Sequence, residues 1–157
     1  MGAIFISYRR ADSEGYSGRL FGDLVKAYGR KNVLIDVAGM AKGRDFRITI
    51  AQRLEECSVF LAVIGRSWLT ITDDSGNRRL DDPRDLVRVE TAAALKRNLP
   101  VLPVLVNGAQ MPREVDLPDE LKDLAYRDGV ELTHQDSEVR LPSWVGKFDS
   151  VTVCQVL

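Results

Sequence analysis

The adjacent arginines Arg9 and Arg10 are the first residues of this 157-residue chain whose type and position could support chemistry. They follow the apolar run 3–6 and Ser7, a pattern typical of a buried parallel strand that ends in polar residues. In an open α/β sheet, ligands bind beyond the carboxyl ends of the strands. Two neighbouring guanidiniums at such an end predict an anionic ligand or a partner carboxylate.

Glu90 is the second candidate, because of its place on a predicted helix. At 100° per residue with Val87 at the origin, Glu90 falls at about 300°, between Leu86 at about 260° and Ala94 at about 340°. A carboxylate on an apolar face costs free energy unless it is paired or used, so such a position is a candidate for a functional site. The alternative is a structural ion pair with a lysine or an arginine.

Strands and helices alternate around these residues. Apolar runs predict strands at about 3–6, 32–36, 58–64, 100–106 and 129–133. Helical spacing predicts helices at about 16–28, 46–54 after an Asp45 cap, 83–97 after an Asp82 cap, and 118–125. Pro103 predicts a break or a missing ladder bond in the fourth strand.

This order of elements predicts an α/β, flavodoxin-like three-layer fold. Right-handed crossovers between five strands give a parallel sheet with helices on both faces. We expect the strand order 2-1-3-4-5, with the crevice at the switch point between the first and third strands. The fold serves many functions, so the residues at the strand ends must decide.

Composition excludes several classes of partner. The net charge of -1 gives no overall field that would attract nucleic acid or an anionic membrane. Cys57 and Cys154 are too few and too distant for a disulfide framework or a metal site, which suits the reducing cytoplasm. No apolar run approaches the ~20 residues of a membrane span.

Several common functions of this fold lack their residues here. A phosphorelay receiver needs acidic residues after the first and third strands, where this chain has Arg9, Arg10 and the pair Gly65-Arg66. No glycine-rich dinucleotide motif and no Walker A sequence is present. A serine or cysteine hydrolase needs a partner base, and His134, the only histidine, lies at the end of the weakest strand.

Motifs spread along the chain resemble those of bacterial TIR (Toll/interleukin receptor) domains. The resemblance covers about residues 3 to 133. It rests on the segments IFISYRR at 4–10, VLID at 33–36, VIG at 63–65 with Trp68 and Leu69, LDDP at 80–83 and VRVE at 87–90. It implies the flavodoxin-like fold and one of two functions: cleavage of NAD+ at the nicotinamide-ribose bond, or assembly with other TIR domains as a scaffold.

The resemblance assigns the catalytic role to Glu90. Nicotinamide leaves NAD+ as a neutral molecule, so no general acid is needed and a single carboxylate can suffice. Glu90 would hold the ribose hydroxyls and stabilise the oxocarbenium-like transition state. The implied enzyme is an NAD+ glycohydrolase that releases ADP-ribose or a cyclic isomer, with NAD+ as substrate and neither a cofactor nor a metal.

A set of substrate-binding residues accompanies Glu90 in this hypothesis. They are Phe5, Ser7, Arg9, Arg10, Asp36, Asp45, Phe46, Trp68 and Asp82. Structural alternatives stay open for most of them. Trp68 could stack on a substrate ring or belong to the core, and Phe5 could be ordinary core. Arg9 and Arg10 could bind the pyrophosphate or hold strand ends by ion pairs, for instance with Asp36. A helix cap and a core contact would explain Asp45 and Phe46 equally well.

The loop 37–44 corresponds to the segment by which TIR domains contact one another. Its candidate self-association residues are Gly39, Met40, Lys42 and Gly43; the family leads us to expect Pro-Gly where Lys42-Gly43 stands. The resemblance implies that self-assembly with other TIR domains completes the active site, in bacterial immune or anti-phage signalling. The alternatives are a non-catalytic TIR scaffold or host-signalling mimic, and an unrelated ligand-binding module.

We expect residues 1–135 to form the TIR domain and 136–157 to form a C-terminal tail. Pro142 interrupts the region where the family has a last helix, so a short helix near 143–148 or a packing segment is expected there. The tail could also lead to a fused or associated sensor module.

Overall fold

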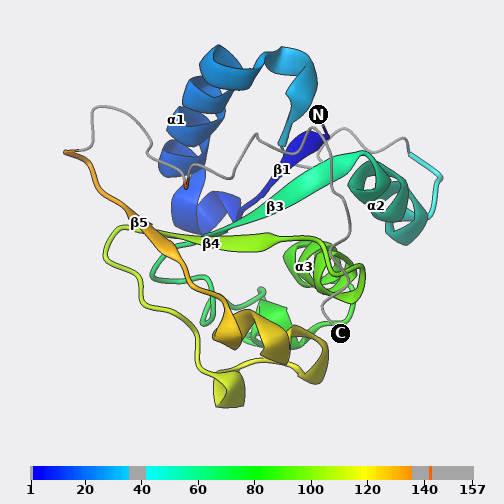
Figure 1. Ribbon diagram of the computed structural model, residues 1–157. Helices are drawn as coiled ribbons and strands as arrows, with labels where there is room; N and C mark the ends of the chain where they lie inside the picture. Colours follow the sequence, from blue (N-terminus) through cyan, green and yellow to red (C-terminus); the bar gives the residue numbers. More distant parts are fainter. Residues whose placement is uncertain (1, 36–41, 136–141, 143–157) are drawn as a thin grey trace, which may run out of the picture.

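The computed structural model describes residues 2–35, 42–135 and 142. In this part of the chain, five strands form one parallel sheet in the order β2-β1-β3-β4-β5, which confirms the predicted flavodoxin-like topology (Figure 1). The strands are β1 (Ala3–Ser7), β2 (Val33–Ile35), β3 (Cys57–Ile64), β4 (Val101–Val106) and β5 (Val130–Leu132). The α-helices are α1 (Arg10–Tyr28), α2 (Phe46–Glu55) and α3 (Leu86–Lys96). Four 3-10 segments complete the described elements: η1 (Arg30–Asn32), η2 (Arg79–Asp81), η3 (Glu114–Asp116) and η4 (Asp119–Tyr126).

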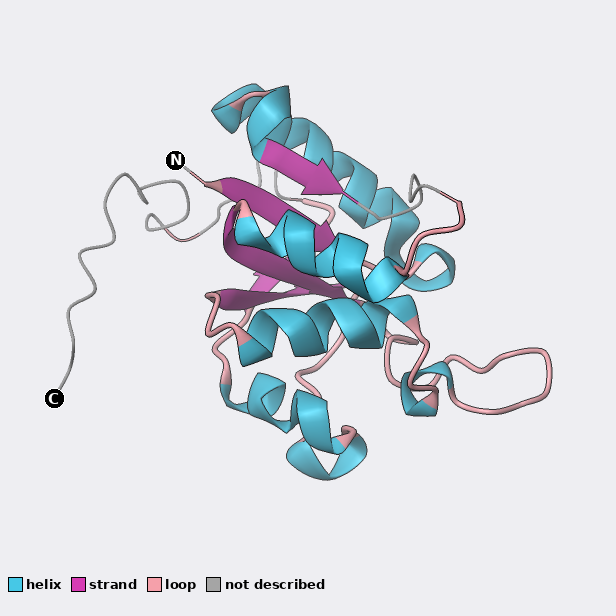
Figure 2. Ribbon diagram, turned by 90° about the vertical axis from the view of Figure 1, so that its right-hand side faces the viewer, coloured by secondary structure: helices cyan, strands magenta, loops and turns pink. Residues whose placement is uncertain are grey.

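The sheet is buried on both faces by two separate apolar clusters. Alternate residues of β1 and β3 point to opposite sides, as the two-residue period of a strand requires. Ile4 and Ile6 pack with Leu20 and Leu24 of α1 on one face. Phe5 lies in the cluster of α2, α3 and η4 on the other face, where α2 and α3 lie side by side (Figure 2). Ser7, two residues after Phe5, therefore belongs to the α3 side.

Helix α1 begins at Arg10, six residues before the predicted start at residue 16. Its first turn is separated from the rest by a kink at Ser13, where φ is -146° and ψ is 24°. The apolar stripe begins only at Tyr16, so periodicity could not show the first turn. Asp12 holds that turn through contacts with residues distant in sequence.

Asp12 joins the first turn of α1 to the residues that follow β3. Its carboxylate accepts hydrogen bonds from the backbone N–H of Gly65 at 2.8 Å and of Ser67 at 2.7 Å. Gly65 has no room for a side chain, because a Cβ there would lie 2.5 Å from both carboxylate oxygens. Because Gly65 has no side chain, the Asp12 carboxylate can approach the backbone directly after β3.

Replacing Gly65 by alanine should lower the free energy of unfolding by about 1–3 kcal/mol, because the displaced carboxylate leaves the part-buried N–H of Gly65 without its acceptor and breaks the second hydrogen bond, to Ser67. Gly22→Ala is the matched control, since a Cβ at this position of α1 meets nothing within 4 Å. That variant should gain about 0.5–1 kcal/mol from helix propensity. Urea unfolding measures both, and equal effects of the two variants would contradict the role given to the Asp12 bridge.

Of the two outcomes expected at Pro103, the break is absent and the missing ladder N–H stands, and the helix expected at 118–125 takes another form. Strand β4 runs without a break through Pro103, which pairs in register with Ala62 of β3. β5 pairs with β4 only from Val104 onward, and a missing N–H is tolerated where one side has no neighbouring strand. The predicted helix at 118–125 is the 3-10 segment η4.

Candidate active site

A hydrogen bond joins Glu90 of α3 to Ser7 at the end of β1. Ser7 Oγ donates to Glu90 Oε2 at 2.6 Å, across 83 positions of the sequence. Both residues are buried, with exposed fractions of 4% for Glu90 and 2% for Ser7. Glu90 shares its buried face with Val87, Thr91 and Ala94, as the helical wheel predicts. The carboxylate therefore lies in the protein interior at the carboxyl end of β1.

Arg9 fixes the start of the helix that contains Glu90. Its guanidinium donates to both carboxylate oxygens of Asp85, at 2.9 Å to Oδ1 and 2.7 Å to Oδ2. Asp85 is also the N-cap of α3, because Asp85 Oδ2 accepts the backbone N–H of Arg88 at 3.1 Å. A two-pronged Arg–carboxylate pair fixes both orientation and distance. This pair thus attaches the N-terminus of α3 to Arg9, which lies two positions after the end of β1.

The Arg9–Asp85 pair explains the observed start of α3 at Leu86. We expected Asp82 to cap the helix and Pro83 to open it, and the structure shows Asp85 in that role instead. Asp82 caps a local turn, since its Oδ1 accepts the N–H of Arg84 at 2.8 Å. The Arg9 contact comes from 76 positions away, so the local sequence could not rank Asp85 above Asp82.

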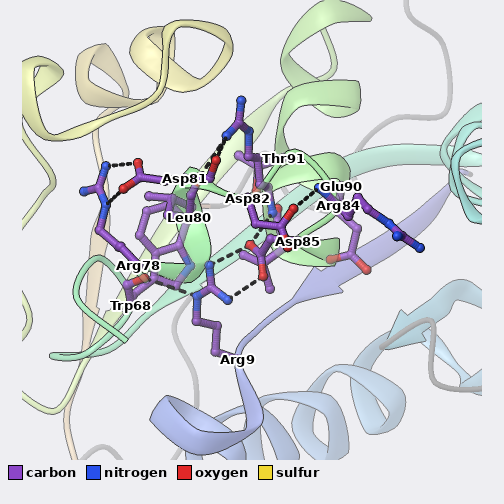
Figure 3. Close-up of polar contacts among 12 residues, drawn as sticks. Arg9, Trp68, Arg78, Leu80, Asp81, Asp82, Arg84, Asp85, Glu90 and Thr91 are labelled. Atoms are coloured by element: carbon purple, nitrogen blue, oxygen red, sulfur yellow. Dashed lines mark hydrogen bonds and ion pairs between the residues drawn. The ribbon is translucent and has the colours of Figure 1, made fainter. Parts of the chain in front are cut away.

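Arg9 also reaches the turn after β3. Its Nε donates to the Trp68 carbonyl oxygen at 3.2 Å, and its guanidinium lies 6.0 Å from the centre of the Trp68 ring (Figure 3). Arg9 is only 4% exposed. Its guanidinium uses several N–H donors in these hydrogen bonds, and one of its faces lies over the Trp68 ring. The structure thus gives Arg9 the ion-pairing role that the sequence left open, with Asp85 as the partner observed.

A cleft of about 600 Å³ lies at the N-terminus of α3. Its lining contains four arginines and three aspartates, a small positive excess suited to an anionic ligand. The lining residues are Arg9, Arg10, Asp73, Arg79, Asp82, Arg84, Asp85, Leu86 and Val87. Glu90 does not line this cleft; it lies one helical turn further along α3 than Leu86 and Val87.

Arg10 and Asp82 are the predicted substrate-binding residues that lie at this cleft with exposed side chains. Four further residues line the cleft and were not predicted from the sequence: Arg79, Arg84, Asp73 and Asp85. The long polar loop 65–82 was a signal for Arg79 and Asp73, because such loops in compact domains are usually functional. For Asp85, the available signal was an acidic residue placed directly before the apolar stripe that begins at Leu86.

Trp68 and Phe5 lie in the core and not in the cleft. Each is 1% exposed, and the Phe5 ring stacks on Phe60 with the ring centres 5.3 Å apart. The substrate-stacking role expected for Trp68 finds no support in this placement. A core residue and a substrate-stacking residue could both be an aromatic residue near a strand end, so the sequence does not distinguish these two roles for Trp68. The packing of the turn after β3 distinguishes them.

Asp45 and Phe46 begin α2, away from the cleft. Asp45 caps the helix by accepting the N–H of Arg47 at 2.9 Å, as predicted. Hydrogen bonds from the Arg47 side chain, and then from its backbone, lower the pKa of Asp45 to about 2. Phe46 packs partly buried against the core cluster. The structural alternatives therefore account for both residues.

The self-association loop is described only in part. Lys42 and Gly43 are exposed in the turn before α2, and Gly43 has a φ of 85°, in the region that favours glycine. Gly39, Met40 and the predicted substrate-binding residue Asp36 lie outside the described residues, as does the tail apart from Pro142.

Among the described residues, no group of three or more histidine, cysteine, aspartate or glutamate side chains could hold a metal ion. None of the helices that the structure describes is long and apolar enough to cross a bilayer.

Comparison with known proteins places this chain in a family. Residues 4–141 match the family model of the TIR domain. The chain is 26% identical over 136 residues to the NAD(+) hydrolase sarm1 of Drosophila melanogaster, an alignment that covers 83% of this chain and 9% of the fly protein. The chain thus spans less than a tenth of the length of that relative.

The fold is also that of solved TIR domains. The TIR domains of the activated Roq1 resistosome directly recognising the pathogen effector XopQ superpose with a TM-score of 0.59 at 14% identity, covering 84% of this chain and 88% of theirs. With the family match over most of the sequence and the same sheet, the chain belongs to the TIR domain family.

Proposed function

We propose that this TIR domain is an NAD+ glycohydrolase that cleaves the nicotinamide-ribose bond and uses Glu90 as its catalytic carboxylate. The observation that supports this most is the buried Glu90 carboxylate, oriented by Ser7 at the carboxyl end of β1 and adjoining a cleft rich in arginine. The 26% identity to an NAD(+) hydrolase adds support, over the part of that protein which this chain covers.

The chemistry needs a negative charge near the ribose. When the bond between ribose C1′ and the nicotinamide nitrogen breaks, nicotinamide leaves neutral and positive charge builds on the ribose ring. A carboxylate held in a water-poor interior stabilises that charge more strongly than one in water. Water then attacks C1′ and loses a proton to give ADP-ribose, or an adenine nitrogen attacks to give a cyclic isomer. No cofactor or metal enters this scheme.

The cleft arginines suit the other end of the substrate. NAD+ has a pyrophosphate with two negative charges, and guanidiniums bind such oxygens well. Arg79 and Arg84 are exposed at the cleft, on opposite sides of Asp82 in sequence. Within the proposal they and Arg10 bind the pyrophosphate, while Arg9 stays paired with Asp85.

We further propose a cytoplasmic protein that becomes active on self-assembly and serves bacterial immune signalling, alone or with a sensor module. Assembly is part of the proposal because the buried Glu90 does not line the cleft of this single domain, and a second domain that packs on the exposed turn at Gly43 before α2 could complete the site. Such gating by conformational change is common in enzymes.

The deciding experiment measures nicotinamide release from NAD+ by chromatography over a range of protein concentrations, with and without a crowding agent. We expect the specific activity to rise at least tenfold as assembly is forced, because assembly would shift the population toward the active state by on the order of a few kcal/mol. Gly43→Val serves as the assembly control, because valine disfavours the φ of 85° at this turn. It should lower activity at a given concentration; because the strained φ also lowers the free energy of unfolding, by about 1–3 kcal/mol, both proteins are assayed well below the unfolding midpoint of the variant. No release under any condition would exclude the enzyme.

One observation favours the alternative of a non-catalytic scaffold. The ring expected to stack on the substrate, Trp68, is buried, so the aromatic contact in the hypothesis is missing from the described cleft. A scaffold predicts self-association that is lost in Gly43→Val and unchanged by Glu90→Gln, with no nicotinamide released. Sedimentation of the two variants, run beside the release assay, separates the two functions.

A further inference from the structure

We infer that Ser7 is a positioning residue that holds the Glu90 carboxylate in place, and that it is not a contact for the substrate. The inference rests on the proposed function and assigns a role within it. It changes the prediction from sequence, which grouped Ser7 with the substrate-binding residues.

The hydrogen bond itself is the first support. The separation of 2.6 Å between Ser7 Oγ and Glu90 Oε2 is the length typical of an O–H donor bound to an ionised acceptor. A serine hydroxyl has a single proton to donate. Since this proton goes to Glu90, Ser7 has none to give to a ribose hydroxyl or a phosphate.

Ser7 is well placed to hold another side chain still. It is the last residue of β1, and its backbone pairs in register with Ala62 of the central strand β3. Its side chain turns about one bond only, so the sheet fixes the hydroxyl oxygen closely. Functional groups are most accurately placed when their supports sit on rigid elements.

Glu90 is the group that needs such support, because its side chain rotates about three bonds. Its backbone is fixed by α3, whose start is tied to Arg9 through Asp85. The tip of the side chain is fixed by Ser7. Losing the second attachment leaves the charge in the site but lets it move, and a misplacement of about 1 Å can cost about 100-fold in rate.

The test compares Ser7→Thr with Ser7→Val, two side chains of nearly the same shape of which only threonine has a hydroxyl. Both are measured for nicotinamide release under forced assembly, with sedimentation to match the assembled fraction to wild type. We expect valine to lower kcat by about 30- to 100-fold with KM within about twofold, and threonine to recover at least about tenfold of that loss. A raised KM with unchanged kcat would instead identify a substrate contact. Equal kcat values for the two variants would rule out a role for the hydroxyl.

A second measurement does not depend on activity. A double-mutant cycle in urea combines Ser7→Val with Glu90→Met, which keeps the length of the side chain and removes its acceptor. If Ser7 holds Glu90, the two changes in the folding equilibrium constant should depart from additivity by about tenfold. Additive changes would overturn the inference whatever the assay shows. A strong coupling in a protein that releases no nicotinamide would reject the proposed function alone.

Discussion

Replacing Glu90 by glutamine should reduce nicotinamide release from NAD+ by at least about 1000-fold. Glutamine keeps the shape of the side chain, and its carbonyl oxygen can still accept the Ser7 hydroxyl, so the packing of α3 is retained. What is lost is the negative charge that stabilises the ribose cation in the transition state. We expect KM to change little, because the effect falls on the transition state and not on binding.

The measurement is the release assay under forced assembly, with the unfolding midpoint recorded for each variant. Glu131→Gln is the matched control, because it removes an exposed carboxylate from β5, the edge strand of the sheet. Its activity should equal that of wild type. A Glu90→Gln enzyme that keeps more than a tenth of its activity would show that another group provides the charge.

Replacing Arg9 by methionine should lower the free energy of unfolding by about 3–5 kcal/mol, the usual cost of removing one partner from a buried ion pair. The Arg9 side chain is 3% exposed and that of Asp85 10%, so little water reaches the Asp85 carboxylate that would be left behind. The variant also loses the donor to the Trp68 carbonyl. Activity should fall as well, because the start of the Glu90 helix loses its attachment to β1.

Urea unfolding of Arg9→Met is best compared with Arg84→Met, which removes an exposed arginine from the same cleft. The control should change the unfolding free energy by no more than about 0.5 kcal/mol. Arg9→Lys tests the geometry, because lysine keeps the charge and lacks the two-pronged fork. If Arg9→Met costs less than about 1 kcal/mol, the pair with Asp85 is not what fixes α3.

The sheet was predictable because its evidence is local. Each strand is a short apolar run, each crossover contains a helical stripe, and handedness leaves few topologies. The buried position of Glu90 was predictable for the same reason, since its place in an apolar arc depends only on its own helix. The residues around it were harder, because their partners lie far away in sequence: Ser7 binds a residue 83 positions on, and Arg9 one 76 positions on.

The roles of individual polar and aromatic residues depended on packing that no periodicity encodes. Trp68 follows a strand end and has the type suited to stacking, yet the turn after β3 places it under Arg9 in the core. Asp82 and Asp85 are equally plausible caps by sequence, and the distant guanidinium selects between them. Where two local conformations are about equal in free energy, a tertiary contact determines which of them forms.

The attachments of Ser7, Arg9 and Asp12 also bear on how the domain folds. Within six residues these three side chains attach to Glu90, Asp85 and Gly65, and the attachments close loops of 83, 76 and 53 positions. Forming contacts so distant in sequence requires closing long loops, which costs conformational entropy. We therefore expect these contacts to form late in folding. The Glu90 carboxylate therefore reaches its place only when β1, β3 and α3 are already together. A chain in which these elements are not yet together lacks the candidate site, so the proposed catalysis would require the completed fold.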